Sequence, residues 1–245
     1  MLERVLQRQG DLFRFLSSRM TLAAVIWLAV GLGLSTFVIW GFFEITEEVL
    51  EGETQAFDRS VLLWIDAHFP AWMEGPMRFF TAIGYYRVVV PLLAVAVAFF
   101  LWKGWRSAAV LLCVSTLGGM FLTTVLKAVF RRDRPDLIAT GYEAGFFSFP
   151  SGHATVAVGF YGVLTLILAY RTAGVSRWLI VVCGMFTVVM IGLSRMYLGV
   201  HYPTDIAAGY LAAPLWVVFV GILHFAWISA RSLGIAKTKR GKPNR

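Results

Sequence analysis

The chain has 245 residues, of which 58% are hydrophobic and only 15% are charged. A soluble domain of this length needs far more polar surface to cover its core, so the composition excludes an ordinary soluble protein and indicates an integral membrane protein. The formal net charge of +8 would suit a nucleic-acid partner, but the placement of lysine and arginine around the apolar runs explains it more simply. The expected partner is therefore the lipid bilayer, and no nucleic acid.

The N-terminal residues 1–19 combine four arginines with leucine, valine and phenylalanine at helical spacing. This pattern is typical of an amphipathic helix on the membrane surface. The next apolar run, 21–43, is too long for the core of a signal peptide and lacks a small-residue cleavage pattern, so it predicts the first membrane span. We expect three parts: the amphipathic segment (1–19), a six-span domain (20–230) and a basic tail (231–245).

Residues 44–84 differ in character from the apolar runs on either side. Acidic side chains outnumber basic ones there, and aromatic residues such as Phe57, Trp64 and Trp72 recur among apolar residues at helical spacing. Short helices with an aromatic face at headgroup depth fit this pattern better than a plain exposed loop. We predict short interfacial helices in the first extracytoplasmic loop.

Five further apolar runs predict additional spans, at about 86–102, 107–130, 153–170, 178–194 and 206–229. The expected fold is therefore all-α, a bundle of six transmembrane helices with both termini on one side. Fourteen of the 22 lysines and arginines lie in the terminal segments and in the connections after the second and fourth spans. The positive-inside rule makes this side cytoplasmic, and it predicts a multi-pass protein of the cytoplasmic (inner) membrane.

Three clusters of ionisable residues lie on the opposite, extracytoplasmic side, and the first contains Lys127 and Arg134-Pro135. If the third span continued as a helix through this cluster, the two cations would share one face, roughly 10 Å apart along the axis. Two cations on one face suit a phosphate group. A basic flank of a membrane span is the simpler reading of this stretch alone, but basic residues are depleted on the outward side.

The second cluster, Pro150-Ser151-Gly152-His153, opens the fourth predicted span. Ser151 is a natural helix N-cap, and Gly152 lets the backbone approach a ligand closely. The first-turn amides and the positive end of the helix dipole then favour an anion, and His153 would act as a proton donor beside it. An ordinary helix start with an interfacial histidine explains the tetrapeptide equally well.

The third cluster runs from Ser194 to Asp205 and contains Arg195 and His201. Pro203 suits the first turn of the sixth span, and Asp205 in that turn can reach back toward His201, as in a capping box. An aspartate bonded to one imidazole nitrogen leaves the other nitrogen as a base or nucleophile. A capping aspartate and an unrelated histidine would explain each residue separately, but not their combination.

Together the clusters predict an anion site made of Lys127, Arg134, Arg195, Ser151 and Gly152. Three cations exceed what a carboxylate ligand needs and match a phosphate dianion with its charge-rich transition state. The two histidines and the aspartate resemble a metal-binding facial triad, but the surrounding cations would repel a divalent metal. We therefore expect neither a metal nor another cofactor.

The three clusters resemble the signature of the type-2 phosphatidic-acid phosphatase (lipid phosphate phosphatase) superfamily of six-span membrane enzymes. The family pattern is Lys-x6-Arg-Pro, Pro-Ser-Gly-His and Ser-Arg-x5-His-x3-Asp, and it is matched without substitution at Lys127–Pro135, Pro150–His153 and Ser194–Asp205. The order, spacing and placement relative to the spans also agree. The resemblance covers roughly residues 55–225 and is closest to the bacterial membrane branch.

The resemblance implies a metal-independent mechanism with a phosphohistidine intermediate. In that scheme His201 attacks phosphorus, Asp205 orients its imidazole and His153 protonates the leaving group. The remaining residues hold the phosphoryl oxygens: Lys127, Arg134, Ser151, Gly152 and Arg195. Candidate substrates are undecaprenyl diphosphate, phosphatidylglycerol phosphate and phosphatidic acid.

Two other functions stay open at this point. A lipid phosphotransferase would use the same intermediate, and a non-catalytic transporter or scaffold would use the same fold. The sequence leaves the lipid, the choice between mono- and diphosphate and the oligomeric state undetermined.

Overall fold

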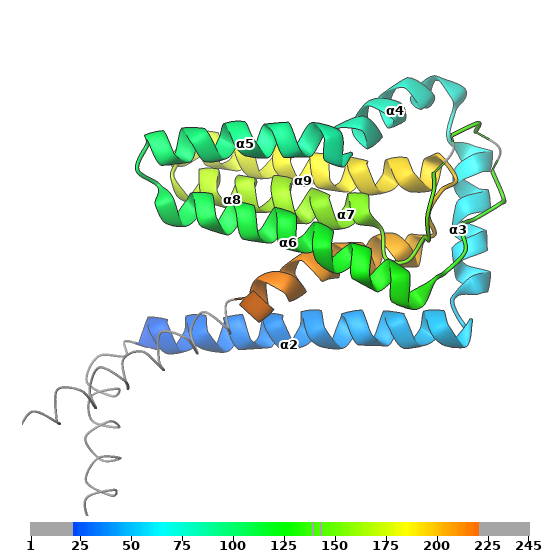
Figure 1. The fold of residues 1–245 in the computed structure, drawn as a ribbon, viewed down its shortest axis with the longest axis horizontal. Helices are drawn as coiled ribbons and strands as arrows, with labels where there is room; N and C mark the ends of the chain where they lie inside the picture. The colour runs from blue at the N-terminus through cyan, green and yellow to red at the C-terminus, as the bar shows by residue number, and fades with distance from the viewer. Residues whose placement is uncertain (1–21, 139, 143, 221–245) are drawn as a thin grey trace, which may run out of the picture. The chain divides into compact units, whose positions relative to one another are not determined.

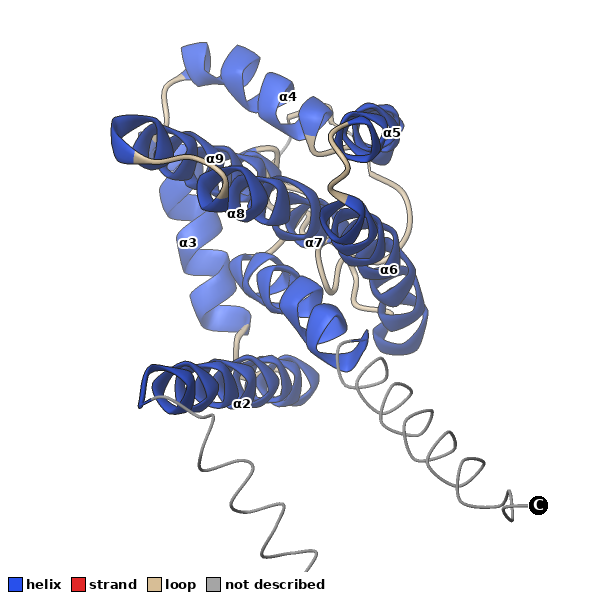
Figure 2. Cartoon of the chain, turned by 90° about the vertical axis from the view of Figure 1, so that its left-hand side faces the viewer, coloured by secondary structure: helices blue, strands red, loops and turns tan. Residues whose placement is uncertain are grey.

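The computed structural model describes residues 22–138, 140–142 and 144–220. All regular structure in these residues is helical (Figure 2), which confirms the expected all-α class. The chain divides into two compact units, Met1–Val38 and Ile39–Arg245. The predicted amphipathic segment and basic tail lie outside the described residues.

The described part of the first unit belongs to helix α2 (Leu22–Glu51), which continues into the second unit. Its side chains Ile26, Leu32 and Phe37 are 52%, 62% and 59% exposed, as expected for a lipid-facing surface. The sequence predicts that the first span ends at residue 43, whereas the helix itself extends to Glu51. It ends there because Gly52, in the left-handed conformation at φ 79°, forms its C-terminal cap.

The second unit contains the remaining helices. They are α3 (Gln55–His68), the 3-10 turn Ala71–Met73, α4 (Glu74–Ile83), α5 (Tyr86–Trp102), α6 (Arg106–Phe130), α7 (Gly152–Val156), the π-helical segment Ala157–Gly162, α8 (Val163–Tyr170), α9 (Gly174–Tyr197) and the last described helix, Pro203–Val220. Figure 1 shows α5, α6, α8 and α9 side by side, with α3 lying across one end of them.

Five of the described helices are long and apolar enough to cross a membrane. Helix α5, predicted as the second span, has 17 residues and is not among the five. It joins the 3-10 turn and α4 across a 55° bend, and counting this bent pair as one span gives six. Helices α3 and α4 confirm that the predicted interfacial stretch is helical.

The interior of the second unit combines apolar side chains with small polar ones. Val89 and Leu93 of α5 pack with Leu112 of α6 and Phe160 of the π-helical segment. Ser115 and Thr116 of α6 both donate hydrogen bonds to the carbonyl oxygen of Gly159, at 2.7 and 3.1 Å. Small residues and hydroxyls between closely packed helices are typical of membrane proteins.

Four helix ends meet at one end of this unit. Helices α6 and α9 end there, while α7 and the last described helix begin there, and the 131–151 connection joins the first of these ends to α7. The short connections 103–105 and 171–173 lie at the opposite end (Figure 1). This topology brings the three predicted clusters together.

Candidate active site

The first cluster does not continue helix α6, so the shared helical face expected for Lys127 and Arg134 is wrong. Helix α6 ends at Phe130, and Arg131 adopts the left-handed conformation (φ 49°, ψ 35°) with its N–H bonded to the Lys127 carbonyl. Pro135 further disfavours helical geometry at Arg134. Arg134 therefore approaches Lys127 from the loop and not from the helix.

The two cations nevertheless converge, because both bind the same loop carbonyl. Lys127 Nζ donates to the carbonyl oxygens of Phe147 at 2.5 Å and Ser148 at 2.9 Å. Arg134 Nη2 donates to Phe147 at 3.2 Å, and its Nη1 donates to the Val200 carbonyl at 2.6 Å. Burial and the neighbouring Arg195 lower the pKa of Arg134 to about 10, so it stays cationic near neutral pH.

The second cluster begins helix α7 as predicted. Ser151 is the N-cap, and its Oγ accepts a hydrogen bond from the Ala154 N–H at 3.4 Å. This places His153 in the first turn, with its ring stacked on Tyr85 at 5.9 Å between centroids. The hydroxyl that the sequence assigns to phosphate thus has a capping role in the structure, and Ser151 itself is fully buried.

The third cluster places Asp205 against His201, the contact that the spacing predicts. Arg134 Nη1 lies 3.2 Å from His201 Nε2, and because a guanidinium only donates, Nε2 must be the acceptor. The imidazole proton is then on Nδ1, which donates to Asp205 Oδ2 at 3.2 Å. Burial, followed by the charges of Lys127, Arg195 and Arg134, holds the pKa of His201 well below its ordinary value. His201 is thus a neutral imidazole with a lone pair on Nε2.

Arg195, at the end of helix α9, is the third cation. Its side chain is 2% exposed, and its Nη1 donates to Thr81 Oγ1 of helix α4 at 2.5 Å. The guanidinium carbon lies 5.1 Å from the centroid of the Tyr142 ring. Arg195 Nε and His153 Nε2 are the buried side-chain atoms of the described residues that lack a hydrogen-bond partner.

These side chains surround a cavity of about 280 Å³. Its wall consists of Tyr85, Lys127, Arg134, Tyr142, Ala144, Gly145, Gly152, His153, Arg195 and His201. Six of the eight predicted site residues therefore meet at one cavity. Ser151 and Asp205 are both fully buried and, within the described part of the chain, support the wall without forming part of it.

A second cavity of about 310 Å³ shares Tyr85, Lys127, Gly152 and His153 with the first. The rest of its wall is mostly apolar and comes from Gly84, Tyr86, Met120, Thr123, Thr124 and Val156. Tyr86 is 49% exposed, so this cavity reaches the outer surface between helices α5 and α6. A charged centre thus adjoins an apolar cavity at His153.

Several residues of the site were not predicted from the sequence. Arg132, Thr81, Tyr85 and Tyr142 contact predicted site residues, and Asp58 pairs with Arg132. Arg132 lies inside the first cluster, but nothing in the local sequence distinguishes it from the neighbouring Arg131. Asp58 had one usable signal, because an aspartate at that position falls among Leu62 and Ile65 on the buried face of α3.

The described residues contain no cluster of side chains that could ligate a metal ion. Three His, Cys, Asp or Glu side chains do not come together there in an arrangement that could hold a metal ion. Both Asp205 oxygens already accept hydrogen bonds, Oδ1 from Arg132 at 2.7 Å and Oδ2 from His201. The arrangement provides donors for an anion.

Helix α7 packs so closely on the last described helix that Gly209 should not tolerate a side chain. A Cβ atom at Gly209 would lie 2.6 Å from the Ser151 carbonyl oxygen and 2.8 Å from the Ala154 Cβ. We expect Gly209→Ala to lower the free energy of unfolding by about 1–3 kcal/mol and to displace the turn that carries His153. Thermal unfolding in detergent measures this loss.

The matched control is Gly75→Ala, because a Cβ at Gly75 of helix α4 meets open space. This variant should unfold within error of the unmodified protein. Equal midpoints for the two variants would show that the α7 contact is looser than the structure indicates.

A family model described as the PAP2 superfamily matches residues 108–229. The phosphatidylglycerophosphatase B of Bacillus subtilis (strain 168) is 33% identical over 144 residues, covering 57% of this chain and 69% of that protein. The undecaprenyl-diphosphatase of Sulfolobus acidocaldarius is 30% identical over 157 residues, covering 62% of this chain and 70% of that protein.

Two solved structures share the fold. The transmembrane PAP2 type phosphatidylglycerolphosphate phosphatase from Bacillus subtilis aligns with a TM-score of 0.68 at 23% identity, covering 86% of this chain and 98% of that one. LpxE from Aquifex aeolicus aligns with a TM-score of 0.54 at 22% identity, covering 66% of this chain and 93% of that one.

Proposed function

The chain belongs to the PAP2 superfamily, and we propose that it is a lipid phosphatase that removes a phosphoryl group from a lipid phosphate or diphosphate through a phosphohistidine on His201. It is a multi-pass membrane protein, in keeping with its apolar helices and its relatives. The roles of individual residues given below are part of this proposal.

The observation that carries the proposal is the pair of unpartnered buried nitrogens, Arg195 Nε and His153 Nε2. An unsatisfied buried donor is costly unless a ligand completes it. A phosphoryl group in the 280 Å³ cavity would accept from Arg195 through one oxygen. Its leaving-group oxygen would then receive a proton from His153.

The adjoining apolar cavity supports a lipid as the leaving group. It meets the charged cavity at His153, on the side where the leaving group must depart. A hydrocarbon chain in the apolar cavity would pass between helices α5 and α6 toward the bilayer. A soluble phosphate ester would leave this apolar surface exposed to water at a cost.

In the first chemical step, the lone pair of His201 Nε2 attacks phosphorus, and the bond from phosphorus to the leaving oxygen breaks. The imidazolium form of His153 gives its proton to that oxygen and becomes a neutral imidazole, and the lipid product departs. The imidazole becomes positively charged as the nitrogen–phosphorus bond forms, and Asp205 stabilises it through Nδ1–H. Lys127, Arg134 and Arg195 stabilise the charge on the equatorial oxygens.

In the second step, water attacks the phosphohistidine and the nitrogen–phosphorus bond breaks. His153, now without its proton, accepts one from the attacking water, so the enzyme returns to its starting state with phosphate released. Interception by the hydroxyl or phosphate of another lipid would give phosphotransfer by the same route.

The distribution of positive charge supports an extracytoplasmic site. Lys103, Arg106, Arg171 and Arg177 flank the two short connections at the end of the bundle opposite the site. Under the positive-inside rule that end is cytoplasmic. The substrate would then be a lipid with its headgroup in the outer leaflet.

A test of the function is phosphate release by the detergent-purified protein in the presence of EDTA. The panel contains undecaprenyl diphosphate and phosphatidylglycerol phosphate, after the two relatives described above, and also phosphatidic acid and a lipid A 1-phosphate, which present a phosphate monoester on a lipid. We expect release from at least one lipid and no loss in EDTA, because Lys127, Arg134 and Arg195 supply the positive charge. Loss of release in His201→Ala is the control.

Three other results have distinct meanings. Absence of release from every lipid by folded protein would contradict the proposed function and favour a transporter or scaffold. Inhibition by EDTA would contradict the metal-independent mechanism. Transfer of the phosphoryl group to a second lipid, with no free phosphate, would identify a phosphotransferase.

A further inference from the structure

A buried ion network lies behind Asp205, on the side away from His201. Arg132 Nη1 donates to Asp205 Oδ1 and its Nη2 donates to Asp58 Oδ2, both at 2.7 Å. Both carboxylates are fully buried, and the Arg132 side chain is 15% exposed. One guanidinium therefore bridges two buried carboxylates from α3 and the last described helix.

Thr204 closes this network into a ring. Its backbone N–H donates to Asp58 Oδ1 at 3.1 Å, and its hydroxyl donates to Asp58 Oδ2 at 2.7 Å. The same hydroxyl accepts a hydrogen bond from Arg132 Nη1 at 2.9 Å. Asp58 thus binds a free N–H in the first turn of the helix that carries Asp205, and the orientation of Asp205 is fixed from two directions.

The charges in this ring explain why a second carboxylate is present. Asp205 and Arg132 alone would form a neutral pair and would give little support to a positively charged imidazole. Asp58 adds one negative charge, so the network carries a net charge of −1 next to His201 Nδ1. That negative charge opposes the positive charges of Lys127, Arg134 and Arg195, which act on the same imidazole of His201.

We propose that Asp58 and Arg132 are positioning residues for the nucleophile. Arg132 holds the carboxylate of Asp205 in line with His201 Nδ1, and Asp58 restores the negative charge that Arg132 would otherwise cancel. Neither residue touches the cavity that receives the phosphoryl group. This inference rests on the proposed function and extends the charge system of the site by two residues that the signature does not contain.

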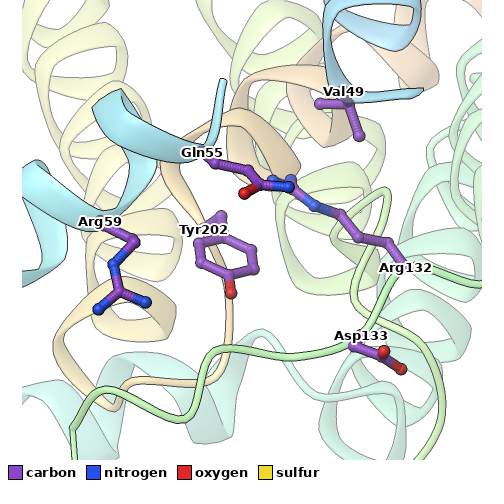
Figure 3. Close-up of a pocket in the computed structure, with 6 residues that line it drawn as sticks. All are labelled: Val49, Gln55, Arg59, Arg132, Asp133 and Tyr202. Carbon is purple, nitrogen blue, oxygen red and sulfur yellow. The ribbon is translucent and has the colours of Figure 1, made fainter. Parts of the chain in front are cut away.

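A separate cavity of about 330 Å³ lies beside the network, lined by Val49, Gln55, Arg59, Arg132, Asp133 and Tyr202. Figure 3 shows Arg132 extending toward Gln55, while Arg59 points away from it. Arg59 is exposed, and among the described residues it forms no ion pair. Arg59 therefore provides a matched control, because its removal changes the charge of this cavity without touching the network.

The pH dependence of kcat/KM tests the proposal, because His201 must be neutral to attack. The charged and titratable groups around it are Lys127 of α6, Arg132 and Arg134 of the loop, His153 of α7, Arg195 of α9, Asp205 of the last described helix and, through Arg132, Asp58 of α3. Arg132 is one of the cations that lower the pKa of His201. The acid limb of the unmodified protein should therefore lie below the ordinary histidine range.

The two network variants should move this acid limb in opposite directions. Asp58→Asn removes a negative charge, disfavours the imidazolium and should shift the limb to lower pH by about half a unit or more. Arg132→Gln removes a positive charge and should shift it to higher pH by a similar amount. Asp58→Asn should also lower kcat by about 10- to 100-fold with little change in KM.

The double variant Asp58→Asn/Arg132→Gln removes one charge of each sign and should return the acid limb close to that of the unmodified protein. Arg59→Gln should leave both the limb and kcat unchanged. If Arg132→Gln does not fold, Asp58→Asn compared with Arg59→Gln still decides the question, since Asp58→Asn preserves the size and shape of the side chain.

Shifts of equal sign in both single variants, or an acid limb that Asp58→Asn does not move, would overturn the proposal. These results differ from a failure of the proposed function. An unmodified protein that releases no phosphate from any lipid contradicts the function itself. An active protein whose acid limb is insensitive to Asp58 contradicts only the positioning role.

Discussion

Replacement of His201 by alanine is expected to lower kcat for lipid dephosphorylation by about 10,000-fold or more. The reason is that the lone pair on Nε2, which the Arg134 contact identifies, forms the bond to phosphorus. Without it, only water positioned by the remaining cations can attack. Initial rates of phosphate release from the preferred lipid of the panel, at saturating concentration, measure the loss.

The matched control for this variant is His68→Ala. His68 is exposed near the end of helix α3, where its Nδ1 contacts the Trp64 carbonyl at 2.8 Å, and it does not line the cavity of the site. This control should retain the activity of the unmodified protein. Near-normal activity in His201→Ala would remove the nucleophile from the mechanism.

Replacement of His153 by alanine should have an effect that depends on the leaving group. For a lipid with an alcohol leaving group we expect kcat to fall by about 100- to 10,000-fold, since an alkoxide departs poorly without a proton. For p-nitrophenyl phosphate, whose leaving group is stable as an anion, the first step should slow by less than about tenfold. Burst kinetics with both substrates separate the first step from hydrolysis of the intermediate.

Equal losses in the first step for both substrates would contradict the assignment of His153 as the proton donor. They would instead indicate that His153 helps to bind the phosphoryl group. Diphosphate lipids should behave more like p-nitrophenyl phosphate, because a phosphate leaving group needs less protonation than an alkoxide.

Local patterns in the sequence were sufficient to predict the helical fold and most of the site. Apolar runs marked the long helices, and Ser151 and Pro203 marked the starts of α7 and the last described helix. The contact between His201 and Asp205 followed from a separation of four residues across a helix start. These features depend on neighbouring residues, which is why one sequence is enough to find them.

Features that depend on distant residues were missed or wrong. The position of Arg134 follows from the left-handed conformation of Arg131 and from loop carbonyls that its guanidinium binds. The break between α4 and α5 was predicted, since the interfacial stretch ends at residue 84 and the second span begins at 86, but its 55° angle was not. The pairing of Asp58 with Thr204 joins residues 146 positions apart, which no local pattern in a single sequence encodes.

The central claim is that a phosphoryl group resides on His201 during turnover, and direct trapping tests it. The His153→Ala protein is mixed with p-nitrophenyl phosphate and quenched with base, because hydrolysis of the intermediate should be slow in this variant and phosphohistidine survives base. Mass spectrometry of the digested protein then locates the modification.

We predict one added phosphoryl group on the peptide that contains His201, and none in the His153→Ala/His201→Ala double variant. A phosphoryl group on another residue, or a burst of p-nitrophenol without a phosphorylated protein, would contradict the account.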